Sequence, residues 1–422
     1  MSHKFSVVDW AIGSNIYEVN VRQYSNEGTF TAFAKHLPRL KKMGVEILWL
    51  MPITPISEKV RQGSLGSYYA CSSYTSINPE FGTLKDFKQL IAAAHQLGFK
   101  VIIDWVANHT GWDHHWTFEH PEWYRKDAMD NFTEINGWHD VIDLDYRKEA
   151  MRLAMINAMQ YWVRECDIDG FRCDMAHLVP IDFWMEARKI CDSLKPLFWL
   201  AECDTPEYHQ AFDISYAWNW MHHSEKHVKG ISSLNDIRNT LHTYTQYPNK
   251  GLKLFFTSNH DENSWNGTEE EKYGLLAKAW WVFSATWEGL PLIYSGQELP
   301  LRKRLRFFDK DLIDWGKPLE REGLFEQILT LRKNNAAIKR GETFVLPSNH
   351  NNELLAYLRR NGQEVVLVLL NLSKKSSIHI QVHHEWLEGS FSSVISGLQY
   401  AFKPGESFEL MAGDCLVYSK VS

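Results

Sequence analysis

The sequence lacks several features that mark other classes of protein. Its six cysteines form no CxxC pair, which favours reduced and buried thiols over a disulfide framework. The net charge of −7 is spread along the chain with no basic block, so we expect neither nucleic acid nor an anionic membrane as a partner. No apolar run approaches the length of a membrane span. The first six residues contain no apolar signal core, which predicts a cytoplasmic protein, or a secreted one whose signal is absent from this sequence.

Aromatic residues, in contrast, are abundant at 14% of the chain. Tryptophan and tyrosine pack well in a protein core, and they also stack against the flat C–H face of a pyranose ring. The composition is otherwise that of an ordinary globular protein, so it leaves both interpretations open. The length of 422 residues allows one large domain and a smaller one.

Short apolar runs alternate with amphipathic runs over the first three quarters of the chain. Helices are predicted over 29–43, 84–97, 147–165, 182–194 and 270–287. Strands are predicted over 15–20, 46–52, 99–106, 170–175, 197–203, 214–218, 252–257 and 290–295. Eight βα units in about this length predict an α/β fold, a (β/α)8 TIM barrel.

The pattern changes near Gly341, where short apolar runs are separated by turn residues. Asn361-Gly362 is a hairpin signal. We therefore predict a catalytic barrel over 1–340 and a C-terminal antiparallel β-domain, sandwich-like, over 341–422. A short insertion over 109–146 follows the third barrel strand.

Ionisable residues concentrate where the predicted strands end. Asp104, the pair Arg172 and Asp174, Glu202 and Asp261 each follow an apolar run. The carboxyl ends of barrel strands meet at one mouth, so these groups should lie together. A single strand-end Asp is often only a helix N-cap, but four such strand ends in one barrel outweigh that reading. Paired carboxylates of this kind are the equipment for glycosidic bond cleavage.

The neighbours of each carboxylate suggest different roles. Arg172 is two residues from Asp174 on the same strand face, so its charge should keep Asp174 ionised. Glu202 has no such partner in the sequence, which favours a raised pKa and the role of acid. Asp261 could stabilise positive charge at the anomeric carbon.

Four motifs in this order resemble those of the α-amylase family, glycoside hydrolase family 13, and the resemblance covers the whole chain. The motifs are Asp104 to His109, Gly170 to His177, Leu200 to Glu202, and Phe256 to Asp261. The resemblance implies Asp174 as nucleophile, Glu202 as acid/base and Asp261 as stabiliser of the transition state. It also implies substrate contacts from Tyr69, Asp104, His109, Arg172, His177, His260 and Arg306. The last lies in a charged run, 302–311, that could equally be a solvated loop.

No cofactor is expected for the chemistry, but the resemblance implies that a structural calcium ion is possible. Asn108 and Asp143 stand where calcium-binding members carry ligands. Calcium needs at least six oxygens, and two side chains are far from that number. The alternative is a hydrogen-bond clasp between Asn108 and the insertion. The Asp113-His114-His115 cluster is interpreted as a wall of the substrate cleft, with metal binding the lesser alternative.

The expected function is that of a retaining α-glucan hydrolase, which cleaves α-1,4-glucosidic bonds of starch-derived or malto-oligosaccharides by double displacement. A transglycosylase or a sugar isomerase on the same scaffold is the alternative within enzymes. A non-catalytic binding relative is less expected, because such relatives lose catalytic carboxylates. A metal-dependent barrel hydrolase would need an early His-x-His strand, which the sequence lacks.

Overall fold

The computed structural model describes residues 5–248, 251–374, 377–403 and 405–421. Within these residues, eight parallel strands close into a barrel in the order β1-β10-β9-β8-β7-β6-β3-β2. The strands are β1 (Ile16–Val19), β2 (Ile47–Leu50), β3 (Lys100–Trp105), β6 (Gly170–Cys173), β7 (Phe198–Ala201), β8 (Ile214–Tyr216), β9 (Lys253–Phe255) and β10 (Leu290–Tyr294). The predicted TIM barrel is confirmed, and each predicted barrel strand corresponds to one of these eight.

The strands form where the sequence is almost continuously apolar, because a parallel barrel strand is buried on both faces. All residues of β2, β6, β7 and β10 are buried. Gly170 begins β6 next to the backbone of Phe198 on β7. A Cβ atom at this position would lie 2.1 Å from the Phe198 carbonyl oxygen, so only glycine fits.

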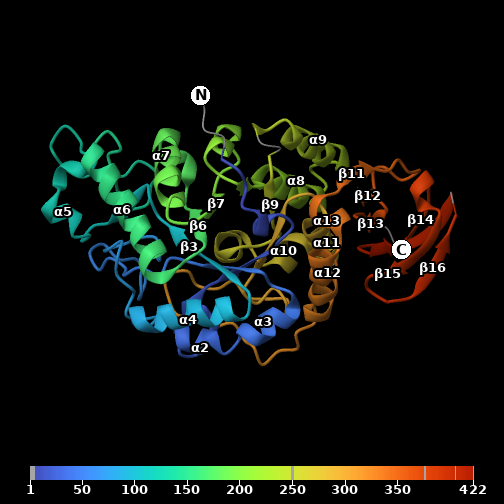
Figure 1. Ribbon diagram of the computed structural model, residues 1–422, viewed down its shortest axis with the longest axis horizontal. Helices are drawn as coiled ribbons and strands as arrows, with labels where there is room; N and C mark the ends of the chain where they lie inside the picture. The colour runs from blue at the N-terminus through green and yellow to red at the C-terminus, as the bar shows by residue number, and fades with distance from the viewer. Residues whose placement is uncertain (1–4, 249–250, 375–376, 404, 422) are drawn as a thin grey trace.

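Helices cover the outside of the barrel (Figure 1). They are α1 (Val21–Tyr24), α2 (Phe30–Ala34), α3 (Leu37–Met43), α4 (Leu84–Gln96), α5 (Trp116–Glu119), α6 (Glu149–Cys166), α7 (Ile181–Asp192), α8 (Trp218–Val228), α9 (Leu234–Thr245), α10 (Glu269–Tyr273), α11 (Ala277–Thr286), α12 (Glu322–Asn334) and α13 (Ala336–Arg340). Short helical turns are η1 (Asp9–Ala11), η2 (Pro121–Trp123), η3 (Ala176–Leu178), η4 (Pro206–Gln210), η6 (Glu262–Asn266), η7 (Gly274–Leu276) and η8 (Glu385–Leu387).

Two predicted helices are wrong as single elements. The helix predicted over 29–43 is two helices, α2 and α3, and Pro38 lies in the first turn of the second. A proline is tolerated there but not in a helix interior, so the chain restarts at this point. The helix predicted over 270–287 is divided into α10, η7 and α11. Gly274, with φ of +51°, ends α10.

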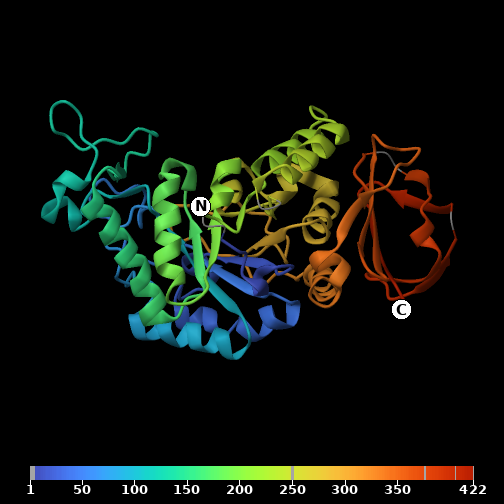
Figure 2. The same cartoon turned by 45° about the horizontal axis from the view of Figure 1, so that its top comes forward.

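The insertion and the C-terminal sheets lie at opposite ends of the long axis (Figures 1 and 2). The insertion is anchored by a two-stranded antiparallel ribbon of β4 (His109–Gly111) and β5 (Val141–Asp143). This ribbon starts directly beyond β3, so it places the insertion beside the carboxyl ends of the barrel strands.

The C-terminal part is antiparallel, as predicted. One sheet has the order β11-β12-β13-β18-β15-β16, and β14 pairs with β17. The strands are β11 (Glu342–Val345), β12 (Leu354–Asn361), β13 (Glu364–Asn371), β14 (Ser377–Val382), β15 (Gly389–Ser393), β16 (Gln399–Phe402), β17 (Glu406–Met411) and β18 (Cys415–Lys420). One face of β13 joins the barrel core through Val366, Val368 and Leu370, so the sheet packs directly on the barrel. In the described part of the chain, no helix is long and apolar enough to cross a membrane.

Candidate active site

A fully buried arginine organises the carboxyl end of the barrel. Arg172 Nη1 lies 2.9 Å from Asp104 Oδ1 and 3.0 Å from Asp174 Oδ1. Its Nη2 lies 2.9 Å from Glu202 Oε1. Glu202 has no charged partner near it in the sequence, but the register of β6 and β7 brings it to the same guanidinium. One positive charge is therefore in contact with three carboxyl groups.

Burial decides the protonation of these carboxyl groups. Burial raises the pKa of Glu202 to about 8, against the opposing charge of Arg172. Burial likewise raises the pKa of Asp174 to about 6, although Arg172 is in contact. At this pKa Asp174 is still ionised at neutral pH, as expected, but desolvation outweighs the single cation and moves the pKa above the ordinary range of an aspartate. Because the pKa of Glu202 is the higher of the two, Glu202 is protonated in preference to Asp174.

The backbone after Asp174 is unusual and points at Glu202. Met175 has φ of +40°, a left-handed conformation that a non-glycine residue rarely adopts. In this conformation its N–H donates to Glu202 Oε2 at 2.8 Å. Met175 thus fixes the Glu202 carboxyl group relative to that of Asp174, and the two residues directly follow the adjacent strands β6 and β7.

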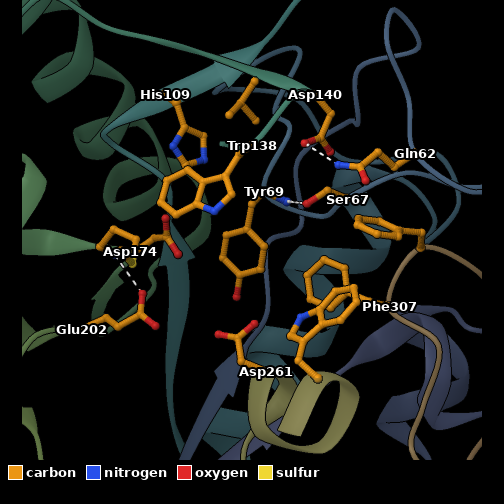
Figure 3. A pocket seen from close by; sticks show the side chains of 14 residues that line it. Gln62, Ser67, Tyr69, His109, Trp138, Asp140, Asp174, Glu202, Asp261 and Phe307 are labelled. Atoms are coloured by element: carbon orange, nitrogen blue, oxygen red, sulfur yellow. Dashed lines mark hydrogen bonds between the residues drawn. The ribbon is translucent and has the colours of Figure 1, made fainter. Parts of the chain in front are cut away.

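A cavity of about 240 Å³ lies over this cluster. Figure 3 shows Asp174 and Glu202 on one side of it and Asp261 facing them. The lining side chains are Gln62, Ser67, Tyr69, His109, Trp138, Asp140, Val141, Asp174, Met175, Glu202, Asp261, Trp265, Phe307 and Phe308. All three carboxylates predicted as catalytic, and the predicted contacts Tyr69 and His109, therefore line one cavity.

Asp104 and His260 lie behind Tyr69. The Tyr69 hydroxyl donates to Asp104 Oδ2 at 3.1 Å and lies 2.7 Å from His260 Nε2. On its other side, His260 Nδ1 lies 2.5 Å from Glu18 Oε1. Burial opposes a charge on His260, but the carboxylates of Asp261 and Glu18 raise its pKa to about 9. The charged imidazole then donates through both nitrogens, which fixes the hydroxyl of Tyr69 at the cavity.

Five of the seven predicted substrate contacts are not part of the cavity lining. Asp104, Arg172 and His260 are buried, whereas the other two are exposed. His177 is exposed, and its carbonyl accepts a hydrogen bond from the Tyr208 hydroxyl. Arg306 is also exposed, and its backbone N–H donates to Asp311 Oδ2. A role for either side chain in binding stays a prediction for sugar units beyond the cavity.

Sequence reasoning missed several cavity residues from loops. Trp265 lies in η6, a single π-helical turn that begins directly after Asp261, and Phe307 and Phe308 lie within the charged run 302–311 after β10. The aromatic pair at 307–308 was a usable signal, since it stands in a polar loop beyond a strand end. Gln62 and Asp140 offered no periodicity that could have identified them.

The candidate calcium ligands are bonded to each other. Asn108 Nδ2 donates to Asp143 Oδ1 at 3.4 Å. Asp143 Oδ2 is buried without a hydrogen-bond partner among the described residues, which is the one feature that suits a cation. However, no three His, Cys, Asp or Glu side chains in the described ranges are grouped to hold a metal ion. Two side chains do not make a calcium shell, so the residues fit the hydrogen-bond clasp better.

The Asp113-His114-His115 cluster is not a wall of the catalytic cavity, contrary to expectation. Asp113 Oδ2 accepts the backbone N–H groups of Glu58 and Lys59. His114 is buried against the Tyr74 ring, with ring centroids 5.0 Å apart. The cluster therefore holds the long loop after β2 against the insertion.

A TIM barrel that gathers several carboxylates at the carboxyl ends of its strands is the architecture of a class of glycoside hydrolases. Within that class, the α-amylase catalytic-domain family matches residues 14–134 and 117–336. The chain belongs to the α-amylase family.

Solved structures and curated proteins agree with this membership. A noncanonic maltogenic α-amylase from Thermotoga neapolitana is 30% identical, with a TM-score of 0.89 over 98% of this chain and 100% of the other. An α-amylase from Lactobacillus plantarum is also 30% identical, with a TM-score of 0.88 over the same shares. The α-amylase MalA of Haloarcula japonica is 25% identical over 87% of this chain, which spans 56% of the length of that relative.

Proposed function

We propose that this protein is a retaining α-glucan hydrolase that cleaves α-1,4-glucosidic bonds of malto-oligosaccharides or starch-derived chains. The observation that carries the proposal is the shared contact of Arg172 with Asp174 and Glu202 at one cavity. Burial raises the pKa of Glu202 to about 8 and that of Asp174 to about 6, so the two neighbouring carboxyl groups differ in their affinity for a proton, as double displacement requires.

In the first step, the Asp174 carboxylate attacks the anomeric carbon and forms a glycosyl ester. Glu202, with its pKa raised to about 8, holds a proton at neutral pH and donates it to the departing glycosidic oxygen. The positive charge that develops on the sugar ring faces Asp261 across the cavity (Figure 3).

In the second step, Glu202 has lost its proton and acts as a base toward water. Glu202 takes a proton from water, the water oxygen attacks the anomeric carbon from the face that the leaving group vacated, and the bond between that carbon and Asp174 breaks, so Asp174 leaves as a carboxylate. Two inversions restore the α configuration of the product. If a sugar hydroxyl replaced water, the same residues would perform transglycosylation.

Glu202→Gln tests the proposal, because glutamine has the shape of glutamate but holds no transferable proton. Turnover of maltoheptaose should fall at least about a thousandfold with an unchanged melting temperature. The wild-type product, followed by proton NMR in the first minutes, should carry the α-anomeric signal. A near wild-type rate in the variant, or a β-anomeric first product, would contradict the assignment.

We also propose a cytoplasmic location. The six cysteines are all free and buried in the structure, which suits a reducing compartment. Fractionation of the native host, with activity measured in each fraction, tests this.

A further inference from the structure

A hydrogen bond crosses one end of the cavity and joins two segments that are distant in sequence. Gln62 lies in the loop after β2, and Asp140 lies in the insertion. The Gln62 side-chain amide donates to Asp140 Oδ1 at 2.9 Å. Figure 3 shows this pair on the opposite side of Tyr69 from Glu202. The two ends of the cavity are therefore chemically different.

The loop that carries Gln62 is also fixed to the loop after β10. Leu65 N–H donates to the Phe308 carbonyl at 2.9 Å. Asp309 Oδ1 accepts both the backbone N–H and the hydroxyl of Ser64. Three loops, from β2, from the insertion and from β10, are thus joined into one wall on this side of the cavity.

The insertion side of the wall is held in place independently. Glu134 Oε2 accepts the N–H groups of Gly137 (2.7 Å) and Trp138 (2.8 Å). The Trp112 indole donates to the His139 carbonyl at 3.0 Å. Asp140 therefore enters the wall from a segment that is already ordered by its own hydrogen bonds.

Only one of the two carboxylate oxygens of Asp140 is hydrogen-bonded within this wall. The residue is 4% exposed and lines the cavity. Its Oδ1 accepts from Gln62, whereas its Oδ2 is buried with no hydrogen-bond partner among the described residues. Burial raises the pKa of this carboxyl group. A buried acceptor without a donor is unfavourable, and a sugar hydroxyl in the cavity would supply the missing donor.

The chemistry of the site decides which end of the substrate meets this wall. Glu202 must lie beside the glycosidic oxygen of the leaving group, so the reducing-end portion extends on its side. The portion that stays bonded to Asp174 extends away from Glu202. That portion carries the non-reducing end of the chain, and it points toward Gln62 and Asp140.

We propose that the Gln62–Asp140 bridge caps the non-reducing end of the substrate, with Asp140 Oδ2 accepting a hydrogen bond from a hydroxyl of the terminal sugar. The enzyme then cuts short products of one length from chain ends and does not cut within long chains. This inference rests on the proposed hydrolase function. It adds a specificity determinant that lies outside the four motifs.

The first test compares two substrates with the wild-type protein. One is maltoheptaose labelled at the reducing end, and the other is the same chain with the terminal 4- and 6-hydroxyls closed in a cyclic acetal. We expect the blocked chain to react at least about tenfold more slowly, and the open chain to yield one short unlabelled product early in the reaction.

The second test uses two variants and a matched control. Asp140→Asn replaces the acceptor Oδ2 with a group of the same shape, and kcat/KM on the open chain should fall about tenfold, mostly through KM. Gln62→Ala removes the bridge and should reduce the discrimination against the blocked chain several-fold. Asp130→Asn, on the exposed part of the same insertion, should behave as the wild type.

The outcomes separate this inference from the proposed function. No hydrolysis of either chain by the wild type would overturn the function itself. Equal rates on both chains, with labelled and unlabelled fragments of many lengths, would leave the function intact and overturn the cap. Wild-type kinetics in a folded Asp140→Asn variant would also overturn it. If that variant fails to fold, the blocked-chain rates of the wild type and of Gln62→Ala still decide.

Discussion

Two buried aspartates of the barrel, Asp174 and Asp213, look alike in their electrostatics and differ in their surroundings. Burial raises the pKa of each to about 6, and each is paired with a buried arginine. Asp213 accepts from Arg188 Nη2 at 2.7 Å and from the backbone N–H of Trp199 at 3.0 Å. It precedes β8, at the end of the barrel away from the site.

The two aspartates differ in how many carboxyl groups share the arginine and in what lies beside them. At Asp213 the nearest arginine and a backbone amide occupy both oxygens, and the residue is not part of the cavity lining. At Asp174 the arginine is shared with Asp104 and Glu202, and the cavity lies alongside. A shifted pKa alone therefore does not identify a catalytic group, because structural ion pairs shift it too.

The largest effect should come from Asp174→Asn. The variant loses the nucleophile but keeps the shape of the side chain, so turnover of maltoheptaose should fall at least about a thousandfold. Stability should stay the same or rise, because one of three crowded carboxyl groups is removed. Kinetics and a thermal unfolding scan measure both quantities. A variant with ordinary turnover would show that the two aspartates do not differ in function.

The matched change Asp213→Asn should have the opposite outcome. The amide group of asparagine would face either Arg188 or the Trp199 N–H, both of which are donors. Breaking a buried pair in this way destabilises by about 3 kcal/mol, so the melting temperature should fall while turnover per folded molecule is kept. A thousandfold loss of turnover at unchanged stability would place Asp213 in the chemistry and end the contrast.

The pH profile should report the cavity cluster and not Asp213. Activity needs Asp174 ionised and Glu202 protonated, so kcat/KM should rise as pH increases through about 6 and fall as it increases through about 8. Each limb should change about tenfold per pH unit, and the two values belong to the coupled cluster. Asp213→Asn should leave this bell-shaped pH profile unchanged, although the pKa of Asp213 is similar to that of Asp174. If the fall in kcat/KM below about pH 6 disappeared in the Asp213→Asn variant, the assignment of that limb to Asp174 would be wrong.

Much of the fold follows from local chemistry that a sequence displays. Barrel strands are buried on both faces, so they stand out as apolar runs, and their carboxyl ends share one mouth by topology. The exact extent of helices depended on single residues such as Pro38 and Gly274, whose effect changes with their position in a turn. An overall helical pattern does not resolve such breaks.

The catalytic carboxylates were predictable because they follow barrel strands, whereas Tyr69, in the loop after β2, was identified only through the family resemblance. Asp174, Glu202 and Asp261 follow apolar runs, whereas the contact of Glu202 with Arg172 depends on the register between β6 and β7. Glu18 lies within β1 among apolar neighbours, and its partner His260 is 242 positions away. The Gln62–Asp140 bridge joins two irregular loops, whose spacing carries no periodic signal.

The smallest effect should come from removing metal ions. Asn108 donates its side-chain amide to Asp143, and its carbonyl accepts the Leu144 N–H at 3.0 Å, so the insertion is tied to the end of β3 without an ion. Treatment with a chelator should therefore leave both turnover and the melting temperature within error of the untreated protein. Asp143→Asn should lower the melting temperature slightly, by weakening the clasp. A fall in the melting temperature on chelation that calcium alone restores would mean that Asp143 Oδ2 is a ligand, and that this corner of the site, unlike the Arg172 cluster, depends on a bound cation.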